Sequence, residues 1–203
     1  KIIENFSEIK KIYKSRYKYN FESKITFLYV SNYVPHKGHQ NLFKAIYNIS
    51  KSHPNIELVC AGKWSIEKYK KILENDKYYL LAKSNISLLG ELDRTEIFYL
   101  YNKCQYIIFA SMCEAGSLAL IESLKFSKPI LLNKMTSNSE YAKNAAIYFN
   151  TLDSNSIESA INSIIHNDIL KAELENNAIK VTKNRFTSKI YVNQLLSEIN
   201  KHL

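Results

Sequence analysis

Two carboxylates, Glu114 and Glu122, are separated by seven residues and are well suited to bind a sugar or a ribose. Glu114 follows the apolar run 106–110, which has the length of a buried strand, and Glu122 lies in the helical segment that comes next. Carboxylate oxygens accept hydrogen bonds from neighbouring hydroxyl groups. Two acids at this spacing are common, so the alternative interpretation is that Glu114 caps a helix and Glu122 is an exposed helical residue.

The segment between the two acids predicts a site for an anion. If a helix begins near Ser117, the backbone amides of Ser117, Leu118 and Ala119 have no acceptor inside the helix. Such a helix start favours phosphate binding. A diphosphate at this point would place its sugar near Glu114 and its ribose near Glu122. The pattern therefore favours a nucleotide-sugar as the ligand.

Lys37 is the second candidate, in the segment YVPHKGH that follows the first predicted strand. A lysine on a tight turn at the end of a strand can reach a phosphate as a point charge. The alternative is that Lys37 is a solvated surface cation, one of 28 basic residues in the chain. Its place at the end of a strand favours the phosphate interpretation.

Six apolar runs of strand length alternate with helical segments along the chain. We predict strands at 25–30, 57–61, 86–89, 106–110, 129–132 and 146–149, and helices at 40–52, 66–81, 93–102, 117–126, 156–166, 169–183 and 188–202. Asp93 and Glu96 form a predicted capping box at the start of the third helix. Near-continuous apolar strands that alternate with helices indicate a parallel sheet covered on both faces. The predicted fold class is α/β, a doubly wound, Rossmann-like parallel sheet with C-terminal helices.

Ligands of such sheets bind outside the carboxyl ends of the strands. All four glycines of the chain, Gly38, Gly62, Gly90 and Gly116, fall in the segments that follow predicted strands. Glycine is common in turns, which explains part of this pattern. Their concentration at this edge nevertheless favours a close approach of the backbone to a ligand.

The composition excludes several classes of protein. Hydrophobic residues make up 46% and charged residues 23% of the 203 residues, which argues against disorder. The three cysteines and five histidines have no disulfide or metal-ligand spacing, as is typical of a cytosolic protein without a metal site. The net charge is +9, but no nucleic-acid-binding motif accompanies it, so we expect no nucleic-acid partner.

We expect three parts in the chain. Residues 1–24 form a basic linker or helix that comes from a preceding domain, because the chain begins with Lys1 rather than Met. Residues 25–167 form the ligand-binding domain, and residues 168–203 form a helical appendix. Contact with a membrane or a protein partner is the alternative interpretation of the basic start.

Taken in order, these motifs resemble the C-terminal, donor-binding domain of the GT4 (group 1) glycosyltransferases, which have the GT-B fold. The matching pieces are Val30, the Pro-His-Lys-Gly segment 35–38, the strand end 58–62, the Leu-Leu-Gly segment 88–90 and the stretch 111–122. Lys128-Pro129-Ile130 and Glu140 continue the resemblance. It extends from about residue 25 to residue 166.

The resemblance implies a retaining transfer from a UDP- or GDP-sugar to a glycan or lipid-linked acceptor, without an obligatory metal or other cofactor. Lys37 would contact the diphosphate and Glu114 the donor sugar, and these two are the implied catalytic residues. Glu122 would bind the ribose hydroxyls, and the backbone of 89–92 would hold the base. The full set of implied donor-binding residues is Asn32, Lys37, Gly38, Gly90, Glu114, Ala115, Gly116, Ser117, Leu118 and Glu122.

The chain also departs from the family pattern. Members often have Gly-Arg where this chain has Ser31 and Asn32, and asparagine cannot neutralise a phosphate. The acceptor site and a catalytic histidine are expected on a preceding domain, so His36 and His39 receive no such role. Two alternatives stay open, a degenerate binding or scaffold module and a nucleotide-sugar epimerase with the GT-B fold. We expect a cytoplasmic protein, with peripheral contact at the inner membrane face as a further expectation.

Overall fold

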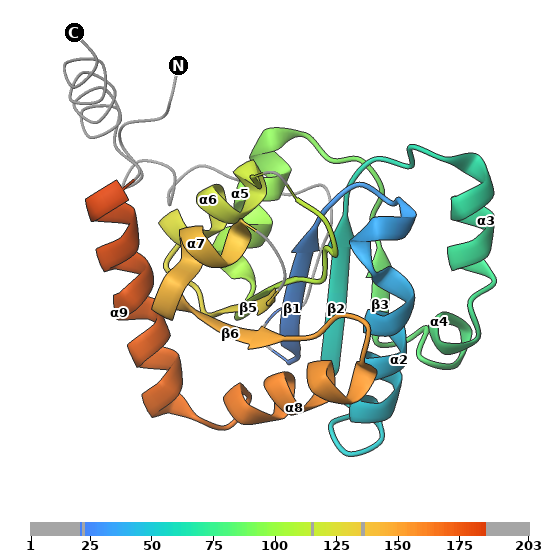
Figure 1. Ribbon diagram of the computed structural model, residues 1–203. Helices are drawn as coiled ribbons and strands as arrows, with labels where there is room; N and C mark the ends of the chain where they lie inside the picture. Colours follow the sequence, from blue (N-terminus) through green and yellow to red (C-terminus); the bar gives the residue numbers. More distant parts are fainter. Residues whose placement is uncertain (1–20, 22, 115, 135–136, 186–203) are drawn as a thin grey trace, which may run out of the picture.

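The computed structural model describes residues 21, 23–114, 116–134 and 137–185. These residues form a six-stranded sheet with the strand order β3-β2-β1-β4-β5-β6, in which all neighbouring strands run parallel (Figure 1). The strands are β1 (Ile25–Val30), β2 (Ile56–Ala61), β3 (Ile86–Leu88), β4 (Tyr106–Phe109), β5 (Ile130–Asn133) and β6 (Ala146–Phe149). The predicted α/β fold class and its six strands are therefore confirmed.

The strands are apolar because helices cover both faces of the sheet. Every residue of β2, β4 and β5 is buried. At the centre of the sheet, Phe27 on β1 stacks against Tyr106 on β4 with 4.8 Å between ring centroids. Such side chains have no solvent-facing side to fill with polar groups, which explains the continuous apolar runs in the sequence.

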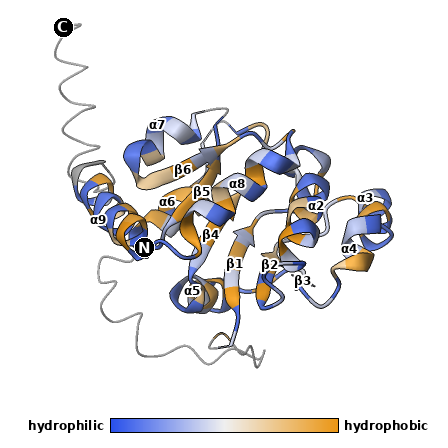
Figure 2. Cartoon of the chain, turned by 90° about the horizontal axis from the view of Figure 1, so that it is seen from below, coloured by the Kyte–Doolittle hydropathy of each residue, from blue (hydrophilic) through white to orange (hydrophobic). Residues whose placement is uncertain are grey.

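The helices complete the layers. They are α2 (His39–Ser50), α3 (Glu67–Glu74), α4 (Lys77–Leu81), α5 (Arg94–Lys103), α6 (Leu118–Lys125), α7 (Asn138–Ala142), α8 (Ser154–Ile164) and α9 (Asp168–Arg185), with the 3-10 turns η1 (Pro35–Lys37) and η2 (Lys143–Ala145). Figure 2 shows α2 and α8 on one side of the sheet and α5 on the other. This arrangement is the doubly wound layering that the alternation of strands and helices predicts.

The prediction of a single helix over residues 66–81 is wrong. The first helix ends at Glu74, and Asp76 begins a second one, because its carboxylate accepts hydrogen bonds from the amides of Tyr78 and Tyr79 at 2.9 and 3.1 Å. An aspartate that caps the amides of the next turn adopts an extended backbone and interrupts a helix. The apolar periodicity continues through the break because both helices pack on the same core.

Two other helical predictions have different outcomes. The capping box at α5 is confirmed, since Asp93 accepts from the amide of Glu96 at 2.8 Å and Glu96 accepts from the amide of Asp93 at 3.1 Å. The predicted helix at 188–202 lies outside the described residues, as do residues 1–20 and 22 of the predicted basic segment 1–24. Helix α9 packs against η2 and α6.

Candidate functional site

A cavity of about 460 Å³ opens at the carboxyl ends of β1, β2 and β4. Its floor consists of the strand ends, where Tyr29, Val30, Ala61 and Phe109 lie. Its walls come from the loops that follow these strands and from the first turn of α6. The cavity therefore lies where the strand order reverses between β1 and β4, the position at which open parallel sheets bind ligands.

The cavity brings together six of the predicted site residues. These are Asn32, Lys37, Glu114, Gly116, Ser117 and Leu118. Three others, Gly38, Gly90 and Glu122, do not line it. Ala115 lies outside the described residues.

Lys37 and Glu114 form an ion pair inside the cavity. Only 15% of the Lys37 side chain and 18% of the Glu114 side chain is exposed. Tyr29 helps to hold Lys37 in place, because the Tyr29 hydroxyl donates a hydrogen bond to the backbone carbonyl of Lys37 at 2.7 Å. Burial raises the pKa of Tyr29, so this phenol stays protonated and remains a donor. Before a ligand binds, the charge of Lys37 is thus balanced by Glu114.

The turn that presents Lys37 depends on Gly38. Gly38 ends η1 in the left-handed conformation, with φ of 69°, and its amide donates to the carbonyl of Pro35 at 3.2 Å. A Cβ at this position would lie 2.5 Å from the carbonyl oxygen of Ala110. Gly38 therefore shapes the loop and packs against the loop after β4, instead of facing the cavity.

The first turn of α6 forms the opposite wall. Ser117 is the N-cap of this helix, and its hydroxyl accepts from the amide of Leu120 at 3.3 Å. The amides of Leu118 and Ala119 are the first two of the helix and have no acceptor within it. Both residues line the cavity, and Leu118 is 77% exposed. The helix start predicted from the sequence therefore lies beside Lys37.

Glu122 points to a different partner. Its carboxylate accepts a hydrogen bond from Nη2 of Arg94, the first residue of α5, at 2.9 Å. The Glu122 side chain is 29% exposed and that of Arg94 is 68% exposed. Ion pairs in such solvated positions are weak and exchange readily. Glu122 lies one helical turn beyond Leu118, so the predicted ribose contact would require Glu122 to exchange Arg94 for the ligand.

The loops after β1 and β2 are held together at the edge of the cavity. Gly62 lies so close to Ser31 that a Cβ added to Gly62 would be 1.9 Å from the carbonyl oxygen of Ser31. Its amide donates to the carbonyl of Gly90 at 2.8 Å. Two residues further on, Trp64 stacks on Tyr33 with 3.8 Å between ring centroids. Gly62 and Gly90 thus serve the packing of the loops.

Several cavity residues were absent from the prediction. They are Tyr29, Val30, Ser31, Ala61, Gly62, Lys63, Ile97 and Phe109. The amide of Ala119, which also lines the cavity, was predicted as part of the anion site. Lys63 could have been found, because it directly follows Gly62 at the end of a predicted strand and is therefore at the ligand edge. Glu91 and Leu92 fall in the stretch that the family resemblance assigns to the base. Ile97 lies within α5, and no local pattern indicates that it reaches the cavity.

His39 is buried under the site and has no sign of acid–base chemistry. Burial, with the nearby charge of Lys37, lowers its pKa to about 3. Its Nε2 lies 3.4 Å from the hydroxyl of Ser31, and its Nδ1 has no hydrogen-bond partner among the described residues. The imidazole is therefore neutral at physiological pH and packs between the rings of Tyr29 and Tyr33.

Among the described residues, no helix combines the length and the apolarity needed to cross a bilayer. Among these same residues, no three His, Cys, Asp or Glu side chains are grouped in a way that could hold a metal ion.

The sequence pattern of the family described as "Glycosyl transferases group 1" matches residues 12–181. Two curated relatives align with most of this chain. The O-antigen chain mannosyltransferase RfbU of Salmonella typhimurium is 28% identical over 161 residues, which are 77% of this chain and 44% of that protein. The capsular polysaccharide biosynthesis glycosyltransferase CapM of Staphylococcus aureus is 25% identical over 177 residues, which are 86% and 46% of the two chains.

The fold is also similar to that of solved glycosyltransferases. HepE of Anabaena, crystallised with UDP and glucose, superposes with a TM-score of 0.76 at 20% sequence identity. The superposition covers 91% of this chain and 50% of HepE. The chain thus spans about half the length of the proteins that it matches.

Proposed function

This chain belongs to the group 1 glycosyl transferases, and on that premise we propose that it is the donor-binding part of a retaining glycosyltransferase. The donor would be a UDP- or GDP-sugar and the acceptor a glycan or a lipid-linked glycan. The names of the two curated relatives, one for O-antigen chains and one for capsular polysaccharide, support an acceptor of this kind. Because the chain spans less than half of each relative, the acceptor site is assigned to the rest of the protein.

One observation supports this proposal above the others. Within one cavity, the ion pair between Lys37 and Glu114 faces the first turn of α6. A diphosphate needs cations and amide donors, and a sugar needs a hydroxyl acceptor. The cavity offers all three, at the edge of the sheet where the fold binds ligands. The complex of HepE with UDP and glucose supports the same class of ligand.

The ion pair suggests how the donor would bind. A diphosphate oxygen competes with Glu114 for the ammonium group of Lys37. Once released, the carboxylate of Glu114 can accept a hydrogen bond from a hydroxyl of the donor sugar. Each charged group thus exchanges one partner for another, which limits the cost of desolvating the pair on binding.

The reaction would break the bond between the anomeric carbon and the diphosphate oxygen and form a bond from that carbon to an acceptor oxygen. Negative charge builds up on the departing diphosphate. Lys37 and the amides of Leu118 and Ala119 would stabilise this charge, because they are held in place before the reaction begins. Glu114 would orient the sugar. No proton transfer is assigned to a residue of this chain.

Calorimetric titration of the 203-residue chain tests the proposal. UDP, GDP, UDP-glucose, GDP-mannose and the nucleosides uridine and guanosine would be compared. We expect one nucleoside diphosphate to bind more tightly than its own nucleoside, because the phosphates contribute most of the charged contacts. Absence of binding by every nucleotide at millimolar concentration would overturn the proposal.

A further inference from the structure

The cavity contains more than one source of positive charge. Among the described residues that line it, the cations are Lys37 and Lys63 and the acids are Glu91 and Glu114. Lys37 is already paired with Glu114. A nucleoside diphosphate brings several negative charges into this space, and one paired lysine cannot balance them.

The backbone of Lys63 is fixed at the rim of the cavity by the loop that follows β1. Its amide donates to Oδ1 of Asn32 at 3.2 Å, and its carbonyl accepts from the amide of Tyr33 at 2.9 Å. The residues on either side are also held, Gly62 by its close approach to Ser31 and Trp64 by its stacking on Tyr33. Four contacts thus define where the Lys63 side chain begins.

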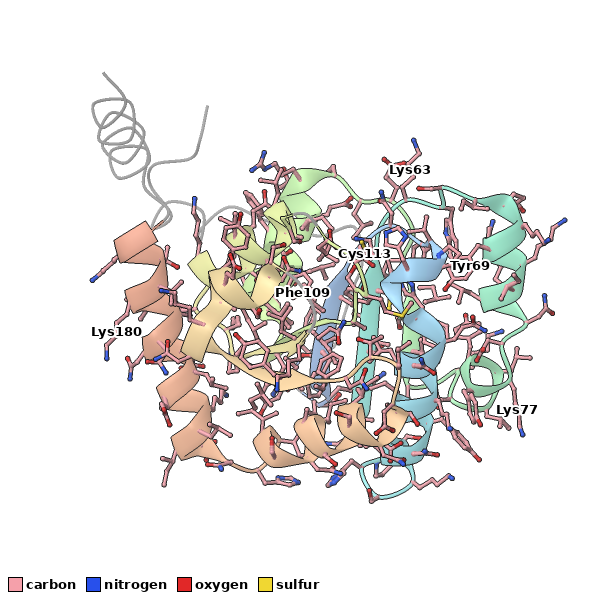
Figure 3. All side chains as sticks on the ribbon, viewed as in Figure 1. Lys63, Tyr69, Lys77, Phe109, Cys113 and Lys180 are labelled. Atoms are coloured by element: carbon pink, nitrogen blue, oxygen red, sulfur yellow. The ribbon has the colours of Figure 1, made fainter. Side chains whose placement is uncertain are left out.

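The Lys63 side chain itself extends into solvent. It is exposed, and Figure 3 shows it extending past the sheet at the end where β2 terminates. Within the described part of the chain, its ammonium group forms no ion pair. A fixed backbone with a long, unpaired cationic side chain suits a group that closes over an anion after it enters.

We propose that Lys63 is the second cation of the diphosphate subsite and that Asn32 is the positioning residue that holds it. This inference rests on the proposed function, since it concerns the same cavity. Asn32 has no charge to offer a phosphate, but its side-chain oxygen orients the backbone of a residue that has one. The positive charge that the loop after β1 lacks at Asn32 is supplied by the neighbouring loop after β2.

The first experiment compares Lys63→Gln with Lys68→Gln, an exposed lysine on α3 that lies away from the cavity. Calorimetry with the 203-residue chain would use UDP or GDP, whichever the parent binds, and the matching nucleoside. We expect Lys63→Gln to weaken the diphosphate about tenfold and to leave the nucleoside unchanged, because only the phosphates meet the ammonium group. The dependence of diphosphate affinity on salt should also decrease.

Three further variants test the role of Asn32. Asn32→Ala should weaken the diphosphate, but the double variant Asn32→Ala/Lys63→Gln should be no weaker than Lys63→Gln alone, because both changes act through one interaction. Asn32→Arg in the Lys63→Gln background should restore diphosphate affinity. Additive losses in the double variant would overturn the positioning role.

The outcomes separate this inference from the proposed function. If the parent chain binds no nucleotide, the proposed function fails and the inference fails with it. If the parent binds the diphosphate but Lys63→Gln and Lys68→Gln bind it equally well, only the role of Lys63 is overturned. A loss of nucleoside and diphosphate affinity by the same factor would indicate a disturbed cavity and would also contradict the proposal. Lys63→Arg, which keeps the charge, should bind the diphosphate like the parent.

Discussion

The ammonium group of Lys37 contacts the carboxylate of Glu114, although 77 positions of sequence separate the two residues. The contact joins the loop after β1 to the loop after β4, directly above the centre of the sheet. Both side chains are mostly buried, so solvent screens this pair less than a surface ion pair. The two charges of the pair balance each other, and a ligand group can replace either partner of the pair.

Glu114→Gln should separate the contribution of the diphosphate to binding from the contribution of the donor sugar. Removal of the carboxylate charge frees Lys37, so UDP should bind as tightly as to the parent or more tightly. A UDP-sugar should lose its advantage over UDP, worth about 1.5–3 kcal/mol for a hydrogen bond to a charged group. The measurement is the ratio of the dissociation constants of UDP and UDP-glucose, or of the guanosine pair if the parent prefers it. The matched control is Glu67→Gln on the exposed side of α3, and an equal loss for both ligands in Glu114→Gln would contradict the role in sugar binding.

Glu122→Ala should weaken the binding of a nucleoside diphosphate about tenfold, which corresponds to about 1.4 kcal/mol. The reason is the loss of an acceptor for the ribose hydroxyls. The comparison is with Glu173→Ala, a surface glutamate on α9, by calorimetry under the same conditions. A nucleotide without the ribose hydroxyls should bind both variants equally. If Glu122→Ala binds the intact nucleotide as well as Glu173→Ala does, Glu122 serves only its ion pair with Arg94.

Gly62→Ala should destabilise the chain by about 2 kcal/mol or more, because the new methyl group collides with the backbone of Ser31 and neither backbone can easily move. The matched variant is Gly116→Ala, whose methyl group would have Tyr141 as its nearest neighbour among the described residues, with the hydroxyl oxygen at an ordinary contact distance of 3.5 Å. Gly116→Ala should change stability by less than about 0.5 kcal/mol. Urea denaturation measures both, and equal stability of the two variants would show that the loops can separate.

His39 should make stability depend on pH. Its pKa is lowered to about 3 in the folded chain, from an ordinary value of 6.5. Between these two values the unfolded chain binds more protons than the folded chain, so the free energy of unfolding falls as the pH is lowered through this window. Above pH 6.5 the full stability is present.

The measurement compares His39→Gln with the parent by urea denaturation at about pH 7.5 and about pH 5. The parent should lose more stability than His39→Gln over this interval. The exposed His166→Gln provides the control and should follow the parent. Parallel pH profiles of the parent and His39→Gln would show that the buried imidazole does not produce the effect.

The fold could be predicted from the sequence because its parallel sheet is buried on both faces. Runs such as 106–110 contain no polar residue and can occupy only such a layer. The capping box of Asp93 and Glu96 is equally local and was predicted at the right residues. The break between α3 and α4 was missed because Asn75 and Asp76 interrupt the helix without interrupting its apolar spacing. Helix α7 was missed because five residues are too few for a periodic pattern.

The site was only partly predictable, and the reason is spatial. The rule that ligands bind at the carboxyl ends of parallel strands located the loops that contain Lys37, Glu114 and the start of α6. It could not show that Lys37 and Glu114 touch, nor that Glu122 turns towards Arg94, because these contacts depend on side-chain positions between distant segments. The prediction does not include Lys63, because the family resemblance points to Asn32, whose side chain instead supports the backbone of Lys63.

The strand order also has a consequence for how the molecule opens. The sheet consists of a first half, β3-β2-β1, and a second half, β4-β5-β6, and the halves meet where Phe27 and Leu28 pair with Tyr106 and Ile107. The cavity spans this junction, with Lys37 from the first half and α6 from the second. A nucleotide that binds both halves would stabilise the junction between them. It would suppress the partial unfolding in which the two halves separate. Amide hydrogen exchange would therefore slow most along β1 and β4 when the nucleotide binds.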